Sequence, residues 1–243
     1  MRMFAFALRN LKEIIRDPLN LAFGLGFPVV LLSLMSIIQA NIPISIFEIG
    51  NLAPGIVIFG FSFVTLFSAF LISKDRESLF LQRLYTTPLT AKDFIFGYTL
   101  PLLPLAVAQC IICYAAALLF GLEPSVNIIY AILLSIPAAL FFIGLGLLFG
   151  SILSEKQVGG ICGACVTTLT ALLSGAWFNL EVLGEPLVSV VSALPFVHAA
   201  DIGRVVLAGD FAAVCPHMVW VLGYMIIIII AAVCLFLRQM KRQ

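Results

Sequence analysis

The chain has 243 residues, of which 63% are hydrophobic and 10% are charged. Average soluble domains are roughly 45–50% apolar and about 25% charged, so a chain of this size cannot bury its apolar residues in a water-facing globule. The composition therefore excludes an ordinary soluble domain and indicates an all-α, polytopic protein of the lipid membrane. The formal net charge of +1 argues against nucleic acid as a partner.

Residues 3–17 predict an amphipathic helix that lies in the membrane interface. Its apolar stripe has four members: Phe4, Leu8, Leu11 and Ile15. Lys and Arg side chains occupy the other faces, and such a helix beside a membrane span is expected to lie with its apolar side down. An ordinary solvated helix is the alternative. Asp17-Pro18 ends the pattern.

Six apolar runs are long enough to cross a bilayer as helices, which takes about 20 residues. They cover residues 19–38, 52–73, 94–120, 126–153, 158–178 and 214–237. Pro101 and Pro104 predict a kink in the third run. No acidic or basic residue lies well inside any run, which argues against a proton-coupled carrier and against an intramembrane hydrolase.

A polar interval, 74–93, separates the second and third spans. It contains a short amphipathic helix, 78–87, and a stripe at helical spacing that comprises Leu81, Leu84, Tyr85 and Pro88. Pro88 stops this helix, and Thr90 and Asp93 have the spacing of a capping box for the next helix. A separate short helix between two spans suits contact with another protein at the membrane surface.

Residues 179–213 fit neither a span nor a simple loop. Two short helical patterns, from Pro186 and from about His198, are separated by Pro195 and are each too short to cross. We therefore expect a re-entrant or interface-lying helical hairpin. His198 and Asp201 lie three residues apart and could hydrogen-bond or hold a metal, but a pair without further ligands favours a structural role. We predict no metal site.

Lys and Arg gather on one side of the predicted spans. Four lie in the N-terminal segment, four in 74–93, one in 154–157 and three in the C-terminal tail, which together make twelve of the thirteen. The positive-inside rule places these segments in the cytoplasm and 179–213 outside. Arg204 is the single basic residue on the outer side. We therefore expect a multi-pass protein of the plasma membrane with both termini in the cytoplasm.

The order of these features resembles the permease subunits of type-2 ABC transporters, most of which are exporters. Arg76-Glu77, Leu84, Thr87-Pro88-Leu89 and Gly97 resemble that family's R-E…L…T-P-[LV]…G pattern. An amphipathic N-terminal helix before six spans is a second similarity. The likeness covers nearly the whole chain, and the order of the motifs is more specific than any one of them.

The external region carries a third similarity. Ser174-Gly175-Ala176-Trp177-Phe178 followed by Leu194-Pro195-Phe196 resembles the family's hairpin region. The chain departs from the family after the aromatic pair, where a proline is common and Asn179-Leu180-Glu181 stands here.

The resemblance implies a transport subunit without catalytic residues or a cofactor of its own. The chain has no G-x-x-x-x-G-K-[ST] phosphate loop, so ATP and magnesium would bind to a separate cytosolic ABC ATPase. Two ATPase subunits and two permeases, identical or different, would form the working unit. The helix 78–87 would couple the two proteins through five residues: Glu77, Leu81, Leu84, Tyr85 and Pro88. An external gate would comprise Trp177, Phe178, Pro195 and Phe196.

Apolar lateral surfaces and the lack of an evident charged pocket are compatible with export of an amphipathic drug, antibiotic or lipid, as in multidrug efflux. Two other classes stay open. An ion-coupled secondary transporter would be favoured by an inverted repeat, and an intramembrane enzyme or assembly factor by a polar constellation within the spans. Neither feature is visible in the sequence.

Overall fold

The computed structural model describes residues 2–42, 48–78, 91–177 and 184–240. All regular secondary structure in these ranges is helical. The elements are α1 (Arg2–Ile15), α2 (Pro18–Leu21), the π-helical η1 (Ala22–Gly26), α3 (Phe27–Ala40), α4 (Ile49–Glu77), α6 (Ala91–Leu119), α7 (Asn127–Leu134), α8 (Ile136–Ile152), α9 (Glu155–Gly160), the π-helical η2 (Ile161–Val166), α10 (Thr167–Leu173), α11 (Glu185–Val191), α12 (Pro195–Leu207) and α13 (Val214–Met240).

Six stretches of the described chain are long and apolar enough to cross a bilayer. They are Ala22–Ala40, Ile49–Glu77, Asp93–Leu119, Asn127–Ile152, Glu155–Leu173 and Val214–Leu235. The first, fourth and fifth are built from more than one helical element, because π-turns or a short break interrupt the α-helix. The predicted all-α membrane fold with six spans is confirmed.

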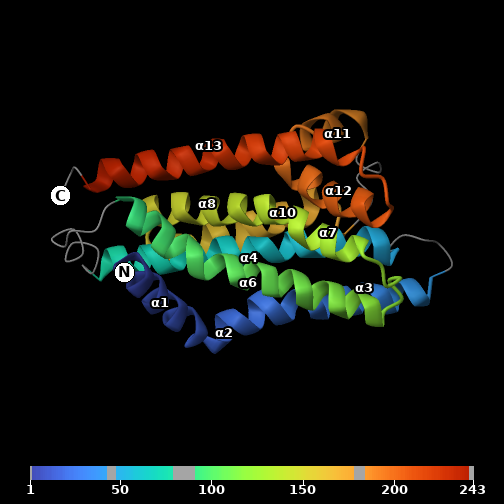
Figure 1. Cartoon of the computed structure of the whole chain (residues 1–243), viewed down its shortest axis with the longest axis horizontal. Helices are drawn as coiled ribbons and strands as arrows, with labels where there is room; N and C mark the ends of the chain where they lie inside the picture. The colour runs from blue at the N-terminus through green and yellow to red at the C-terminus, as the bar shows by residue number, and fades with distance from the viewer. Residues whose placement is uncertain (1, 43–47, 79–90, 178–183, 241–243) are drawn as a thin grey trace.

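Helix α4 lies at the centre of the bundle (Figure 1). In its most apolar window 83% of the residues are buried, against 11% in α13. Helix α8 approaches it closely, because a Cβ at Gly146 would lie 2.4 Å from Ser68 Cβ and a Cβ at Gly150 would lie 2.7 Å from the Ala69 carbonyl oxygen. The glycines of α8 thus pack within the chain, against the central span.

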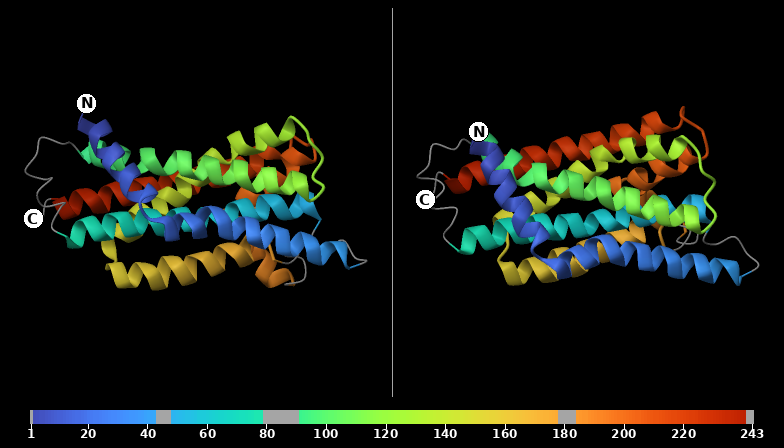
Figure 2. Two further views of the ribbon diagram at one scale, coloured as in Figure 1. Left: turned by 90° about the horizontal axis from the view of Figure 1, so that it is seen from below. Right: turned by 60° about the horizontal axis from the view of Figure 1, so that its bottom comes forward.

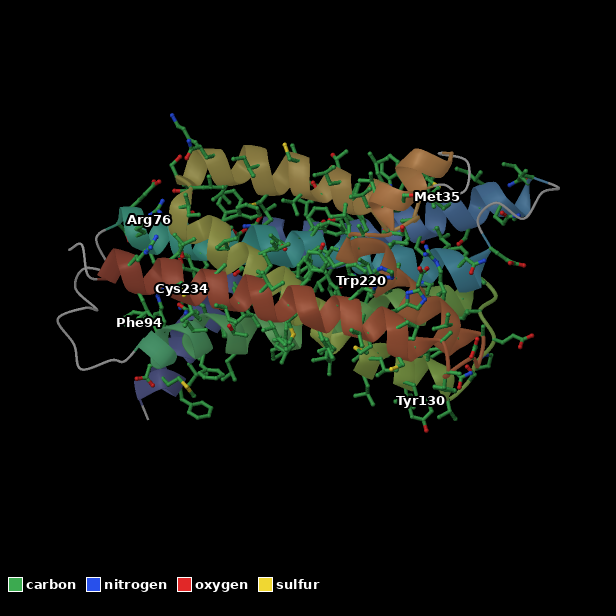
Figure 3. The ribbon with its side chains drawn as sticks, turned by 90° about the horizontal axis from the view of Figure 1, so that it is seen from above. Met35, Arg76, Phe94, Tyr130, Trp220 and Cys234 are labelled. Atoms are coloured by element: carbon green, nitrogen blue, oxygen red, sulfur yellow. The ribbon has the colours of Figure 1, made fainter. Side chains whose placement is uncertain are left out.

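The bundle has two chemically different ends. Both termini lie at one end, with α1, the end of α4 and the start of α9, and we call this the basic end (Figures 1 and 2). Arg76 and Phe94 mark it in Figure 3. Helices α11 and α12 lie at the opposite end, the hairpin end. The interval 79–90 connects α4 to α6 outside the described residues and begins at the basic end.

Helix boundaries differ from the predicted ones around the fifth span. Helix α9 begins at Glu155, before the predicted start of the fifth span at residue 158, and Ser154 is its N-cap: Ser154 Oγ accepts from the Gln157 amide, and the Ser154 amide donates to Gln157 Oε1. This capping box satisfies amides that a helix start leaves unpaired. At the other end the helix stops at Leu173, two residues before Gly175, whose φ of 66° is costly for other residues.

Candidate functional site

Four consecutive charged residues form the last turn of α4: Lys74, Asp75, Arg76 and Glu77. Successive residues of an α-helix point about 100° apart, so the four side chains leave α4 in four directions. Lys74 and Asp75 bind residues of α1, whereas Arg76 and Glu77 bind the turn between α8 and α9, and we call this set the α4 junction. The predicted coupling interval begins directly after it.

Asp75 is the buried member of the junction, with 1% of its surface exposed. Its carboxylate accepts from Arg9 Nη1 at 2.6 Å, from Arg9 Nη2 at 2.7 Å and from Tyr98 Oη at 2.9 Å. A bidentate guanidinium with a third donor compensates the loss of water around a buried charge. Burial alone would lower the pKa of Arg9, but its hydrogen bonds to Asp75 and the nearby acidic charges raise it above the usual value.

Helix α1 is locked to α6 beside this pair. Asn10 is fully buried and donates from Nδ2 to the Gly97 carbonyl oxygen at 3.0 Å. The Phe6 ring fills the space over Gly97, where a Cβ would lie 2.2 Å from Phe6 Cδ1, and it packs edge-on against Tyr98 at a centroid distance of 5.0 Å. Gly97 is therefore required for close approach of the two helices, which gives a physical reason for its place in the family pattern.

The opposite face of α1 stays open. Phe4, Leu8 and Ile15 are 58%, 54% and 60% exposed, so most of the predicted apolar stripe faces away from the protein. An exposed apolar stripe on a helix that crosses the bundle obliquely (Figure 2) suits the lipid interface. The stripe that docks the helix onto α6 is a different one.

Arg76 and Glu77 join α4 to the turn between α8 and α9. The Arg76 guanidinium donates to the carbonyl oxygens of Ser151 and Leu153, at the C-terminal end of α8, where carbonyls lack helical partners. Glu77 Oε1 accepts from the Glu155 amide at 2.9 Å, at the N-terminus of α9. Each charge thus has the sign that complements the helix dipole it meets.

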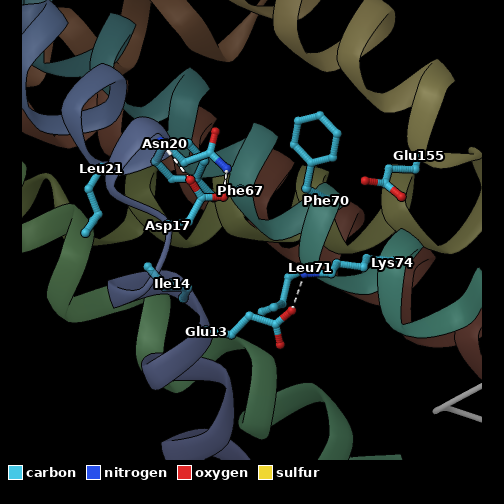
Figure 4. A pocket seen from close by; sticks show the side chains of 10 residues that line it. All are labelled: Glu13, Ile14, Asp17, Asn20, Leu21, Phe67, Phe70, Leu71, Lys74 and Glu155. Carbon is cyan, nitrogen blue, oxygen red and sulfur yellow. Dashed lines mark hydrogen bonds and ion pairs between the residues drawn. The ribbon is translucent and has the colours of Figure 1, made fainter. Parts of the chain in front are cut away.

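A cleft of about 270 Å³ lies beside the junction, between α1 and α2 on one side and α4 and α9 on the other (Figure 4). Its apolar lining includes Phe67, Phe70 and Leu71 of α4. Polar groups come mainly from the other elements, and Lys74 Nζ binds Glu13 Oε1 at 2.8 Å across it. The cleft is therefore amphipathic.

Arg204, the single basic residue predicted on the outer side, has a structural role at the hairpin end. Its Nη2 donates to the Ser174 oxygen at 2.7 Å and to the Gly175 oxygen at 3.2 Å, and its Nε donates to the Asn51 oxygen at 3.2 Å. Nη1 binds Asp201 Oδ1 at 2.8 Å. One side chain on α12 thus caps the end of α10 and contacts the start of α4.

The structure places the sequence-predicted site residues as follows. Glu77 is an exposed member of the α4 junction. Trp177 is 44% exposed, whereas Pro195 is buried at the start of α12 and Phe196 packs on Phe142 of α8 at a centroid distance of 5.9 Å. The remaining predicted site residues lie outside the described ranges, and their roles stay predictions: Leu81, Leu84, Tyr85, Pro88 and Phe178.

Sequence reasoning missed the buried core of the junction. It did not single out Asp75, Tyr98 or Asn10, and it placed Arg9 only among the basic residues on the faces away from the apolar stripe. The available signal was the position of Asp75 between Lys74 and Arg76 at the end of a 29-residue helix, which could have indicated an ion pair. Its partner lies 66 residues away in the sequence, and local pattern does not reveal a pairing at that distance.

These features define a class: a multi-pass helical membrane protein whose surface helix is locked by a buried ion pair to the end of its central span. The chain belongs to the ABC-2 type transporter membrane family, whose sequence model matches residues 1–208. It is 27% identical over 128 residues to the capsule polysaccharide export inner-membrane protein CtrC of Neisseria meningitidis serogroup A, a match that covers 52% of this chain and 48% of that protein. The chain thus spans about half the length of this curated relative. The resemblance inferred from the motifs is confirmed.

Proposed function

We propose that the chain is the membrane-spanning permease of an ATP-driven exporter, energised by a separate cytosolic ABC ATPase. The α4 junction carries the proposal, together with the family. The interval 78–90 leaves α4 where Asp75 holds α1 and α6 and where Arg76 and Glu77 hold the turn between α8 and α9. A displacement of that interval by a partner would act on all of these helices at once.

In the proposed assembly, two ATPases bind ATP and magnesium and two permeases, identical or different, enclose the path. The helix 78–87 would insert into the ATPase with Leu81, Leu84, Tyr85 and Pro88 toward it, and Glu77 at its start. The predicted cytoplasmic location of the basic end follows from the twelve Lys and Arg residues of the sequence segments that are predicted to share one side of the membrane. Arg204 does not weaken this topology, because its guanidinium is held by three carbonyl oxygens and a carboxylate.

The proposed substrate is amphipathic: a drug, an antibiotic or a lipid-like molecule. The cleft beside the junction supports this class, because it combines aromatic lining from α4 with charged side chains from α1 and α4. A polysaccharide is the second candidate, and it is supported by the relative named for capsule polysaccharide export. At the outer end, the proposed gate comprises Trp177, Phe178, Pro195 and Phe196.

The test is co-purification of the permease with candidate ABC ATPases of the same organism, followed by a screen for compounds that stimulate ATP hydrolysis in the reconstituted complex. We expect a stable complex with two ATPase subunits and stimulation by amphiphiles. Stimulation by an oligosaccharide alone would replace the substrate class while keeping the exporter. Transport that needs an ion gradient and no ATPase would refute the exporter and favour a secondary transporter.

Topology has an independent test. A single cysteine at position 82, in a chain whose six native cysteines are replaced, should resist an impermeant maleimide in intact cells and react after permeabilisation. Labelling in intact cells would place the interval 78–90 outside and remove the basis for the proposal.

A further inference from the structure

Three metal-ligating side chains meet at the hairpin end. His198 and Asp201 come from α12 and His217 from the first turn of α13, and their donor atoms all lie within 4.8 Å of one another. His198 Nδ1 is 2.8 Å from His217 Nδ1, and His217 Nδ1 is 3.9 Å from Asp201 Oδ2. All three residues are half-buried, so an ion can reach them.

Neighbouring groups orient two of the three donors. His198 Nε2 lies 2.8 Å from the Ser192 carbonyl oxygen, which can only accept, so the proton of this ring is on Nε2 and the Nδ1 lone pair points toward His217. Asp201 Oδ1 accepts from Arg204 Nη1 at 2.8 Å, which leaves Oδ2 free to face the histidines. Such outer partners fix ring orientation and carboxylate position in metal sites.

We propose that His198, Asp201 and His217 bind one divalent transition-metal ion, and that Zn²⁺ fits this donor set best. Two imidazole nitrogens and one carboxylate oxygen form a three-ligand site in which water takes the fourth tetrahedral position. Bonds of about 2.0–2.1 Å to zinc place two nitrogens about 3.3 Å apart, and the observed donor separations of 2.8 and 3.9 Å lie on either side of that value. All three donor atoms lie within 4.8 Å of one another, so rotation of the side chains would complete the site.

Zinc binding by the two histidines does not require the protein to release a proton. In the metal-free pair, His217 Nδ1–H donates to His198 Nδ1, because the other proton is held at His198 Nε2. When Zn²⁺ binds both Nδ1 atoms, the His217 proton moves to Nε2 of the same ring. Both rings stay neutral and each donates one lone pair to the ion.

The site would join the hairpin to the last span. Helix α13 is held at this end by stacking of Trp220 on His198, with ring centroids 5.3 Å apart, and by the Tyr224 hydroxyl, which donates to the Ala193 oxygen at 2.8 Å. Trp220 lies along α13 in Figure 3. In the sequence the pair on α12 lacks a further ligand, so no metal site was predicted there. His217 supplies it 19 residues after His198.

The experiment uses the full chain, purified in detergent with an affinity tag that contains no histidine. Calorimetric titration with ZnCl₂, and metal analysis after dialysis, should give one Zn²⁺ per chain. His198→Asn and His217→Asn should each weaken zinc binding by more than about 100-fold, since even outer-shell partners are worth 10–100-fold. Tyr224→Phe is the matched control: it removes another tie between the hairpin and α13 but no ligand, so zinc affinity should stay unchanged. MgCl₂ should not bind, because it prefers all-oxygen sites.

The six free cysteines are the competing zinc ligands, and two measurements separate them from the proposed site. The double variant His198→Asn/His217→Asn keeps every cysteine, so undiminished zinc binding by it would overturn the proposal. Co²⁺ bound to the wild-type chain should show ligand-field bands without thiolate charge transfer. A thiolate band, or no metal bound at all, would equally overturn it, and this result needs no variant to fold.

A built-in reporter follows metal binding at the site itself. In a Trp177→Phe chain Trp220 is the remaining tryptophan of the two, and it stacks on His198. Its fluorescence should change with ZnCl₂ and saturate at one equivalent, and the change should vanish when His217→Asn is added. A signal that persists in that variant would show that the ion binds elsewhere.

Discussion

Arg9→Ala should destabilise the protein more than removal of the buried carboxylate that Arg9 binds. The Asp75 side chain is 2% exposed and accepts three hydrogen bonds, two from Arg9 and one from Tyr98. Arg9→Ala leaves the carboxylate buried with the Tyr98 donor. Breaking a buried pair in this way costs roughly 3–5 kcal/mol, and we expect the lower end, about 3 kcal/mol, because Arg9 is 36% exposed and its loss admits water.

The reverse change should be milder. Asp75→Asn removes the charge but keeps an oxygen for the Tyr98 hydroxyl. Arg9 then keeps its ion pair with Glu13 at 2.7 Å and its contact with water, so the cost should be about 1–2 kcal/mol, the worth of a lost charged hydrogen bond discounted for exposure. In the double variant the unpaired buried charge is absent. It should therefore be more stable than Arg9→Ala alone, with a coupling energy of about 2 kcal/mol.

The assay is denaturation of the purified chain in mixed micelles, with protection of α1 from limited proteolysis as a second readout. Arg16→Ala is the matched control, because Arg16 is an exposed arginine directly after the same helix and its removal should change stability by less than about 0.5 kcal/mol. Two results would refute the role of the ion pair. One is an equal change in the free energy of unfolding for Arg9→Ala and Arg16→Ala, and the other is a double variant Arg9→Ala/Asp75→Asn that is less stable than Arg9→Ala alone.

The remaining predictions concern coupling, helix approach and the hairpin end. Leu84→Asp should leave expression intact but abolish ATPase recovery in a pull-down, because it places a charge in an apolar contact. Glu77→Ala should reduce ATPase recovery only slightly. Unchanged recovery for Leu84→Asp would contradict the coupling role. Gly97→Ala should cost about 1–3 kcal/mol through overpacking, measured by denaturation, whereas Gly223→Ala, with nothing within 4 Å of its Cβ, should be near neutral. Arg204→Ala should lower the melting temperature because the part-buried carbonyls of Ser174 and Gly175 lose their donor, and a buried acceptor left unpaired costs about 1–3 kcal/mol. A melting temperature equal to wild type would show that water replaces the guanidinium.

Sequence patterns predicted those parts of the fold that depend on local hydropathy. The six spans and the two short helices of 179–213 are of this kind, because length and apolar period determine them. The start of a helix was predicted less accurately where its N-terminal capping residues were overlooked. Ser154 and Gln157 have capping-box spacing, but this spacing was not used to predict a helix start, so the fifth span begins earlier than the predicted residue 158.

The site depended on contacts that no local pattern contains. Helix α1 has two functional faces, and the apolar stripe with Phe4 and Leu8 was visible, whereas the docking face with Phe6 and Asn10 was not. An amide that is buried against the carbonyl of a distant glycine gives no periodic signal. His217 was overlooked for the same reason. It lies at the start of an apolar span, and only the fold brings it close to His198 and Asp201 of α12.

Both ends of the central span are fixed by arginines that bind backbone carbonyls. Arg76 belongs to α4 and caps α8 at the basic end, while Arg204 belongs to α12 and binds Asn51 at the start of α4 and the end of α10 at the hairpin end. Helix α4 has 29 residues and is about 43 Å long. If a partner displaced the α4 junction, this continuous helix would carry the movement toward Asn51 and, through Arg204, toward helix α12. Helix α13 packs on both α8 and α12, so a movement that begins at the α4 junction would meet the last span along α8 and, at the hairpin end, at α12 beside the cluster around His198.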